Sequence, residues 1–352
     1  MALFPLCKRL AGSARVLRKQ LALYCLLLFL LIYFLKGRRT AVKIDKPPVF
    51  RSLGLDLGVE ARAVTEETVK EKRQRPYQET SWGAPLVWGD SSISVWRRDE
   101  FGQRRVHTGL LTLAVGGYAR FLPRFLSSAE LHFLPGATVT YYILTDSPRT
   151  LEPLPLLAPR RNLKIVPVAE LLGWKHLALR RMALLASAIK DPIRNEVEYV
   201  FCADVDQEFV APVGAEIFGE LVATLHPELF GMPRRAFPYE REPDSSAFVE
   251  DGEGDYYYTS ELYGGLCPEV YTMARACSQL ILQDQERGVQ IAGLEESYLN
   301  RYFINRRPTC VLSPEYSWWE SALAADVPAK RLVSLGRQCE SLEPQKREQH
   351  GC

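Results

Sequence analysis

The most restrictive feature of the sequence is the alternation of short apolar runs with amphipathic runs that begins after Trp82. Four short, mainly apolar runs are candidate strands: Gly109–Val115, Thr138–Thr145, Leu163–Val168 and Tyr199–Ala203. Strands that alternate with helical runs form parallel sheets, because each return to the same edge needs a crossover helix. The sequence therefore predicts an α/β domain with a mostly parallel sheet and a ligand site at the carboxyl ends of its strands.

Two of the intervening runs have apolar residues at helical spacing. One extends from Tyr118 to Phe133. The other, Trp174–Lys190, has three leucines on one face, Leu177, Leu184 and Leu185. Such stripes are typical of helices that pack on a sheet, so we expect them in the core. Arg181 lies near the middle of the second stripe, where a charge without a partner is costly.

An unbroken apolar run at Leu21–Leu35 predicts a membrane anchor. The run is slightly shorter than the about 17–25 residues of a typical span, so a cleaved signal peptide is the alternative. The long basic lead-in, and a Lys-Gly-Arg-Arg sequence where small residues would precede cleavage, favour a retained anchor. Lysine and arginine are balanced on its two sides, so they do not fix its orientation.

These observations divide the chain into five predicted parts. The stem is charged and contains prolines, with its densest charge at Glu66–Arg75. The parts are a cytosolic tail at 1–20, a transmembrane anchor at 21–36, a stem at 37–80, the α/β domain at 81–340 and a C-terminal tail at 341–352.

Charge and cysteine content exclude two classes of function. Lysine plus arginine number 44 and acidic residues 42, so the net charge of +2 predicts no nucleic-acid partner. The eight cysteines form no CxxC pair and lack the spacing of a zinc site. Cys202 lies within an apolar strand, so we expect an inert core thiol.

The sequence Asp204-Val205-Asp206 directly follows the last of the four predicted strands. If the segment is extended, both carboxylates point to one side and Val205 to the other. Two carboxylates at a strand end can bind Mg²⁺ or Mn²⁺ and leave coordination positions open for a diphosphate. The alternative is a pair of turn-forming aspartates, because a D-x-D sequence alone is weak evidence.

A series of short motifs resembles one known family. The motifs occur in family order over about residues 82–337, at 82–88, 111–118, 180–182, 201–206, 225–227, 237–241, 253–258, 264–265, 295–300 and 312–316. In these stretches the chain resembles the retaining glycosyltransferase family 6. The resemblance implies a single GT-A (Rossmann-like) glycosyltransferase domain behind an N-terminal transmembrane helix.

The resemblance also implies a donor site for UDP-Gal or UDP-GalNAc. The metal would be Mn²⁺, with Mg²⁺ as the alternative, held by Asp204 and Asp206. Arg337 falls where the family has a lysine that closes over the diphosphate, and Arg331 competes for this assignment. The implied donor-binding residues are Leu113, Ala114, Val115, Tyr118, Arg181, Asp204, Val205, Asp206, Glu295 and Arg337.

Glu296 matches the catalytic glutamate of the family. It would act as a covalent nucleophile or stabilise an oxocarbenium-like centre during front-side attack, and the sequence does not choose between these roles. Read without the family, Glu295 and Glu296 are acids in the first turn of a helix, where the helix dipole favours them. The double glycine Gly264-Gly265, with the preceding tyrosines, is expected in the sugar pocket.

The chain departs from the family at the positions that select substrates. Donor choice is expected at Thr259, Ser260 and Glu261, where an acidic Glu261 is unusual. The implied acceptor-binding residues are His226, Pro238 and Trp319; Pro238 and Trp319 differ from the family pattern, and Gly293 stands where an indole usually packs. These differences predict a different acceptor from that of the blood-group enzymes.

The sequence thus predicts retaining transfer of Gal or GalNAc to a galactose 3-hydroxyl of a glycolipid or glycoprotein glycan. The expected location is the Golgi membrane, as a single-pass type II protein with a lumenal domain, and a homodimer is left open. The alternatives are a catalytically silent family member that binds sugar nucleotide or glycan, and an inverting transferase with the same metal motif.

Overall fold

The computed structural model describes residues 78–148, 156–169, 174–291, 293–321 and 323–336. The predicted cytosolic tail, the anchor at 21–36, nearly all of the stem, the tail at 341–352 and Arg337 lie outside these residues. Within the described part of the chain, no helix has both the length and the apolarity that crossing a bilayer requires.

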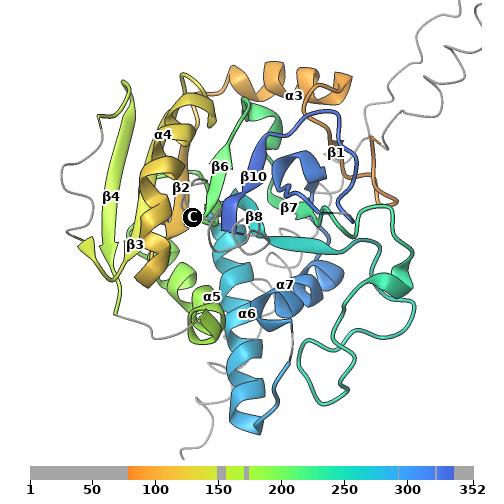
Figure 1. The fold of residues 1–352 in the computed structure, drawn as a ribbon. Helices are drawn as coiled ribbons and strands as arrows, with labels where there is room; N and C mark the ends of the chain where they lie inside the picture. The colour runs from red at the N-terminus through yellow and green to blue at the C-terminus, as the bar shows by residue number, and fades with distance from the viewer. Residues whose placement is uncertain (1–77, 149–155, 170–173, 292, 322, 337–352) are drawn as a thin grey trace, which may run out of the picture. The chain divides into compact units, whose positions relative to one another are not determined.

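The domain is built on one eight-stranded sheet with the order β1-β9-β7-β8-β5-β2-β3-β4 (Figure 1). All neighbouring pairs are parallel except β5–β8 and β7–β8. A second sheet pairs β6 with β10 antiparallel. The strands are β1 Leu86–Val87, β2 His107–Leu113, β3 Thr138–Thr145, β4 Arg161–Pro167, β5 Tyr199–Ala203, β6 Gln207–Phe209, β7 Leu221–Leu225, β8 Tyr258–Leu266, β9 Cys310–Leu312 and β10 Leu332–Ser334.

The four strands predicted from the sequence are confirmed as β2, β3, β4 and β5. Strands β3 and β5 are buried along almost their whole length, because helices cover both faces of a mostly parallel sheet. This double coverage explains why their sequences are continuous apolar runs and do not alternate.

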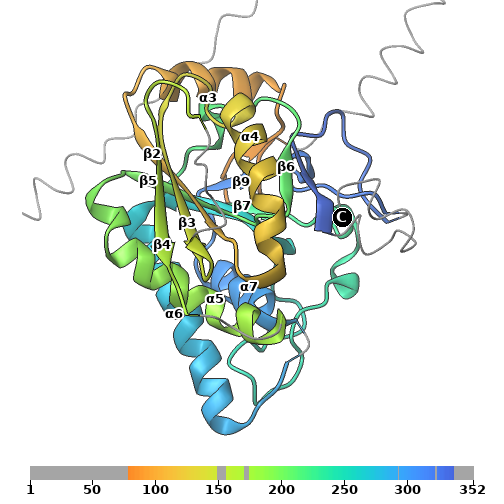
Figure 2. The same cartoon turned by 60° about the vertical axis from the view of Figure 1, so that its left-hand side comes forward.

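Helices cover both faces of the sheet. The two predicted amphipathic runs lie on different faces. Helix α4 packs on one face together with β6 and β10, whereas α5, α6 and α7 lie side by side on the other (Figure 2). The first predicted run begins as a 3₁₀ helix and continues as α4. The helices are α3 Ser92–Gly102, η1 Gly116–Phe121, α4 Leu122–His132, α5 Trp174–Lys190, α6 Cys267–Arg287 and α7 Leu294–Asn305.

The pairing of β7 with β8 contains a register shift. Ala223 lies opposite Tyr263, but the next residue of β7, Thr224, lies opposite Thr259. The intervening residues Ser260–Leu262 therefore bulge away from β7, although Leu262 still pairs with Ala203 on β5. This bulge places the expected donor-selecting residues beside the end of β5.

The double glycine packs closely inside the sheet, and its expected place in the sugar pocket stays a prediction. A Cβ at Gly264 would stand 2.4 Å from the Phe201 ring. Gly265 has a φ of +140°, and a Cβ there would stand 2.2 Å from the carbonyl oxygen of Glu220. The glycines thus allow β5 and β7 to approach β8 closely.

Candidate active site

Asp204 and Asp206 lie at the carboxyl end of β5. The expectation of an extended segment is wrong, because residues 205–206 form a turn in which the N–H of Gln207 donates to the carbonyl of Asp204 at 3.3 Å. Val205 is nevertheless buried in the core, and both aspartates are partly exposed. The turn leads into β6 and leaves the two acidic side chains at the surface of the sheet edge.

Arg181 extends from α5 to Asp204. Its buried guanidinium forms an ion pair with the Asp204 carboxylate and lies 3.6 Å from Oε1 of Glu295. Burial alone lowers the pKa of Arg181, but Asp204, Tyr263 and Glu295 together raise it well above its ordinary value. Arg181 is therefore a fixed positive charge between two acidic side chains from different elements.

Glu295 and Glu296 occupy the first turn of α7, as the helix-dipole interpretation expects. Their contacts, however, are with other elements of the fold. Glu295 is only 3% exposed. Burial raises its pKa above the ordinary 4.5, and the charges of Asp204 and Glu296 add to this effect, whereas Arg181 opposes it.

The Glu296 carboxylate is oriented by two donors. Its Oε2 accepts a hydrogen bond from the N–H of Ser260 at 2.9 Å. The Tyr257 hydroxyl also bonds to it; burial and then the charge of Glu296 raise the pKa of Tyr257. The sequence motif of three tyrosines marked this region, but did not single out Tyr257 as a partner of Glu296.

One of the expected donor-selecting residues, Glu261, contacts the aspartate turn. The N–H of Asp204 donates to the carbonyl of Glu261 at 3.0 Å. The Glu261 carboxylate is buried and accepts bonds from Ser317 Oγ at 2.8 Å and Gln207 Nε2 at 3.2 Å. Thr259 Oγ1 accepts from the N–H of Glu261 at 3.2 Å. A polar network of this chain therefore holds the unusual Glu261.

The two aspartates fit a divalent cation. A Cβ at Gly336 would stand 1.9 Å from Asp206 Oδ2, so the glycine leaves room for this carboxylate. Among the described residues, no third histidine, cysteine, aspartate or glutamate completes a metal-binding group. Two carboxylates are a suitable donor set for Mn²⁺ or Mg²⁺ when a ligand and water supply the remaining oxygens.

The residues expected to hold the nucleotide lie at the end of β2, the strand that pairs with β5. Leu113 and Tyr118 are partly exposed, whereas Ala114 and Val115 are buried in the core. The N–H of Ala114 donates to the carbonyl of Leu144 at 2.8 Å. A nucleotide at this edge would therefore meet the side chains of Leu113 and Tyr118.

Two of the three expected acceptor-binding residues contact each other. The His226 and Trp319 rings meet edge to face, 5.0 Å apart at 87°. The indole N–H of Trp319 donates to Glu228 Oε1 at 2.9 Å, a partner that the sequence did not reveal. His226 also contacts the ring of Tyr257 at 5.7 Å, whereas Pro238 is exposed. His226 is thereby linked through Tyr257 to Glu296.

Comparison with known proteins identifies the family of this chain. The profile of glycosyltransferase family 6 matches residues 60–340. Globoside alpha-1,3-N-acetylgalactosaminyltransferase 1 of Gallus gallus is 40% identical over 247 residues, which cover 70% of this chain and 72% of the relative. Histo-blood group ABO system transferase 2 of Rattus norvegicus is 38% identical over 253 residues, 72% of this chain and 75% of the relative.

A third relative is named as a galactosyltransferase. Alpha-1,3-galactosyltransferase 2 of Homo sapiens is 35% identical over 240 residues, which cover 68% of this chain and 70% of the relative. The family match at residues 60–340 spans the strands and helices that form the candidate site. The chain therefore belongs to glycosyltransferase family 6 and is a hexosyltransferase.

Proposed function

We propose that this chain transfers Gal or GalNAc from UDP-Gal or UDP-GalNAc, with retention, to a galactose 3-hydroxyl of a glycolipid or glycoprotein glycan. Asp204 and Asp206 bind Mn²⁺, or Mg²⁺ in its place. The enzyme acts in the Golgi membrane, anchored through residues 21–36 with its folded domain in the lumen. The relatives named for α-1,3 transfer of galactose or N-acetylgalactosamine support this choice of reaction.

One observation carries the proposal: Arg181 joins Asp204 to Glu295, and Glu295 precedes Glu296 on α7. This arrangement connects the metal-binding turn at the end of β5 to the residue expected to act on the sugar. A bound divalent cation would neutralise charge on the departing diphosphate. The fixed charge of Arg181 holds the Asp204 side chain in place.

Glu296 is held in position before any substrate binds. The Ser260 N–H and the Tyr257 hydroxyl both donate to its carboxylate, which restricts its rotation. A fixed carboxylate can attack the anomeric carbon or stabilise positive charge on it. Tyr257 also contacts His226, so the acceptor side and the catalytic carboxylate share one aromatic ring.

The test is donor turnover followed by product analysis. The chain from Gln78 onward is incubated with UDP-Gal or UDP-GalNAc, with and without Mn²⁺, and UDP release is measured. We expect metal-dependent release from one donor, and none from Asp204→Asn. With a galactoside acceptor, nuclear magnetic resonance should show an α linkage to the 3-hydroxyl. A β-linked product would establish inversion. Mn²⁺-dependent UDP binding without turnover on any galactoside would favour the silent alternative.

A further inference from the structure

A cavity of about 970 Å³ lies at the edge of the sheet opposite the candidate active site. Its wall includes Val106 just before β2, Thr138 at the start of β3 and Arg160 just before β4. Strand β2 has seven residues, so the cavity and Leu113 are separated by roughly 20 Å along the strand. Arg331, the competitor of Arg337 for the diphosphate, lines this cavity, but none of the other residues expected to bind donor, metal or acceptor does.

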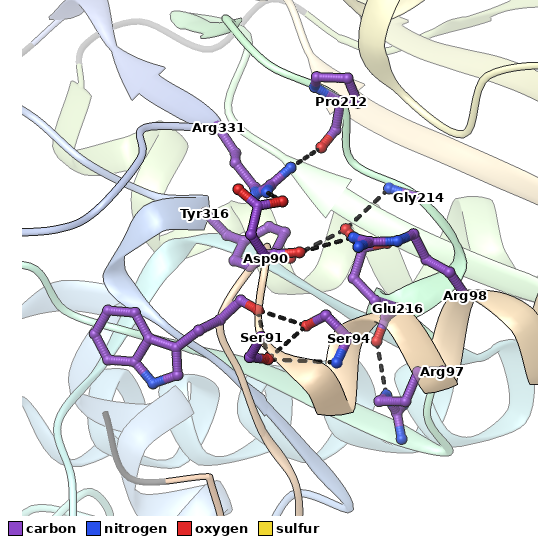
Figure 3. Close-up of polar contacts among 12 residues, drawn as sticks. Asp90, Ser91, Ser94, Arg97, Arg98, Pro212, Gly214, Glu216, Tyr316 and Arg331 are labelled. Carbon is purple, nitrogen blue, oxygen red and sulfur yellow. Dashed lines mark hydrogen bonds and ion pairs between the residues drawn. The ribbon is translucent and has the colours of Figure 1, made fainter. Parts of the chain in front are cut away.

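The cavity wall is strongly basic. Its charged residues are one acid, Asp90, and five arginines, Arg98, Arg104, Arg105, Arg160 and Arg331. The single acid is already neutralised, because Arg331 pairs with Asp90 at 2.8 Å and donates to the carbonyl of Pro212 (Figure 3). Arg98 and Arg104 lie near the acidic Glu216 and Glu100, so the positive field in the cavity comes mainly from Arg105 and Arg160.

Two of these arginines are available to a ligand. Arg105 and Arg160 are exposed, and neither has an acidic partner among the described residues. Arg104 is also exposed, but its guanidinium lies 4.8 Å from the Phe101 ring and 3.9 Å from Glu100. Arg98 donates to the carbonyl of Gly89 at 2.7 Å and lies 3.6 Å from Glu216. Arg105 and Arg160 are therefore the two arginines of the wall without an acidic partner among the described residues.

The rest of the wall is mainly apolar. Phe101 and Phe218 form an edge-to-face pair at 5.9 Å, and Val106 and Leu134 complete this part of the lining. A single phosphate ion would fill little of a 970 Å³ cavity, which is the size of a site for a small organic molecule. The wall therefore suits a ligand with an anionic group and an apolar body.

We propose that this cavity binds an organic phosphate or sulfate ester. Arg105 and Arg160 hold the anionic group through the paired N–H donors of their guanidinium groups, and the apolar body lies against Phe101 and Phe218. The site is separate from donor and acceptor binding and does not depend on the proposed reaction.

Equilibrium dialysis of the full-length chain in a neutral detergent tests the proposal with 1-naphthyl phosphate as the probe. We expect it to bind at least about tenfold more tightly than 1-naphthol, which lacks the charge, or inorganic phosphate, which lacks the apolar body. Added salt should weaken binding. Equal binding of all three compounds, or no binding of the probe, would overturn the proposal.

Substitutions in the cavity wall test whether 1-naphthyl phosphate binds in this cavity. Arg105→Ala with Arg160→Ala should weaken binding at least about tenfold, and lysine at both positions should restore part of it. The exposed Arg194→Ala is the surface control, and Asp204→Asn tests for binding at the candidate active site; both should bind normally. Unchanged binding in the double alanine variant, or loss in Asp204→Asn, would contradict the assignment. Thermal unfolding of each variant establishes that it is folded.

A competition experiment identifies the source of the ester. Dihexanoyl phosphatidylglycerol carries the same anionic group on a lipid, and dihexanoyl phosphatidylcholine is its zwitterionic control. Displacement of 1-naphthyl phosphate by the first lipid alone supports the proposal with a lipid headgroup as the ligand. Failure of both lipids to displace a bound probe supports it with a soluble ester as the ligand.

Discussion

Gly336 lies directly against the carboxylate of Asp206, because a Cβ at this glycine would stand 1.9 Å from Oδ2. The neighbouring N–H of Leu335 donates to the carbonyl of Asp206 at 2.7 Å. The segment that follows β10 is thus fixed to the aspartate turn through both the backbone and a close contact. The position of one expected metal ligand depends on a residue far along the chain.

We predict that Gly336→Ala weakens Mn²⁺-dependent UDP binding at least about tenfold, because the new methyl group must displace the Asp206 side chain by more than an ångström. Isothermal titration calorimetry with UDP and MnCl₂ measures the effect. Gly102→Ala is the matched control, since a Cβ there meets nothing within 4 Å. Normal UDP affinity in Gly336→Ala would show that UDP binding does not depend on the present position of the Asp206 side chain.

Glu296→Gln should retain donor binding and lose at least about 100-fold in transfer rate, because the amide lacks the negative charge that the reacting sugar requires. Tyr257→Phe should reduce the rate about tenfold, since it removes one of the two donors to Glu296. Steady-state rates with separately measured UDP-sugar affinity distinguish chemistry from binding. A near-normal rate in Glu296→Gln would reduce Glu296 to a first-turn acid of α7.

Glu295→Gln should stabilise the protein at pH 7 and have little effect at pH 4. Folding raises the pKa of Glu295 above 4.5, so its favourable contribution is complete below that pH and is lost as pH rises through the folded-state pKa. Glutamine resembles the protonated form and avoids this loss. Thermal unfolding of both proteins across this pH range measures the difference, with the exposed Glu286→Gln as control. A lower unfolding temperature for Glu295→Gln at pH 7 would contradict the prediction.

Trp319→Phe should raise the KM for a galactoside acceptor severalfold and leave donor hydrolysis unchanged. The substitution keeps an aromatic ring beside His226 but removes the N–H that donates to Glu228. His226→Ala should affect the acceptor KM in the same direction. If Trp319→Phe instead reduced UDP release in the absence of acceptor by a similar factor, Trp319 would belong to the donor-binding site.

The parts of the fold that could be predicted from sequence are those in which local preference and burial agree. Strands β3 and β5 are apolar on both faces, and α5 has a clear apolar stripe, so pattern and structure coincide. Strand β8 could not be found in this way. Its residues include Ser260, Glu261 and two glycines, which disfavour strands, and close packing against Phe201 and Glu220 overrides that preference.

The candidate site was only partly predictable for a similar reason. The residues that lie in family motifs, such as Asp204 and Glu296, were found from the sequence, and so was the buried charge of Arg181. Glu228 belongs to no such motif, and only the fold brings it to Trp319. The basic cavity is the extreme case, because its wall comes from separate segments without any common pattern.

The register shift in β8 also sets apart two of the positions at which donor choice is expected, Ser260 and Glu261. Ser260–Leu262 have no partner on β7, a strand that the structure describes in full, although Leu262 still pairs with Ala203 on β5. The three positions are not equally free to vary. Glu261 accepts bonds from Gln207 and Ser317, so its replacement requires compensating changes. Ser260 makes its contact with Glu296 through the backbone alone, which makes this position the natural starting point for divergence or laboratory selection.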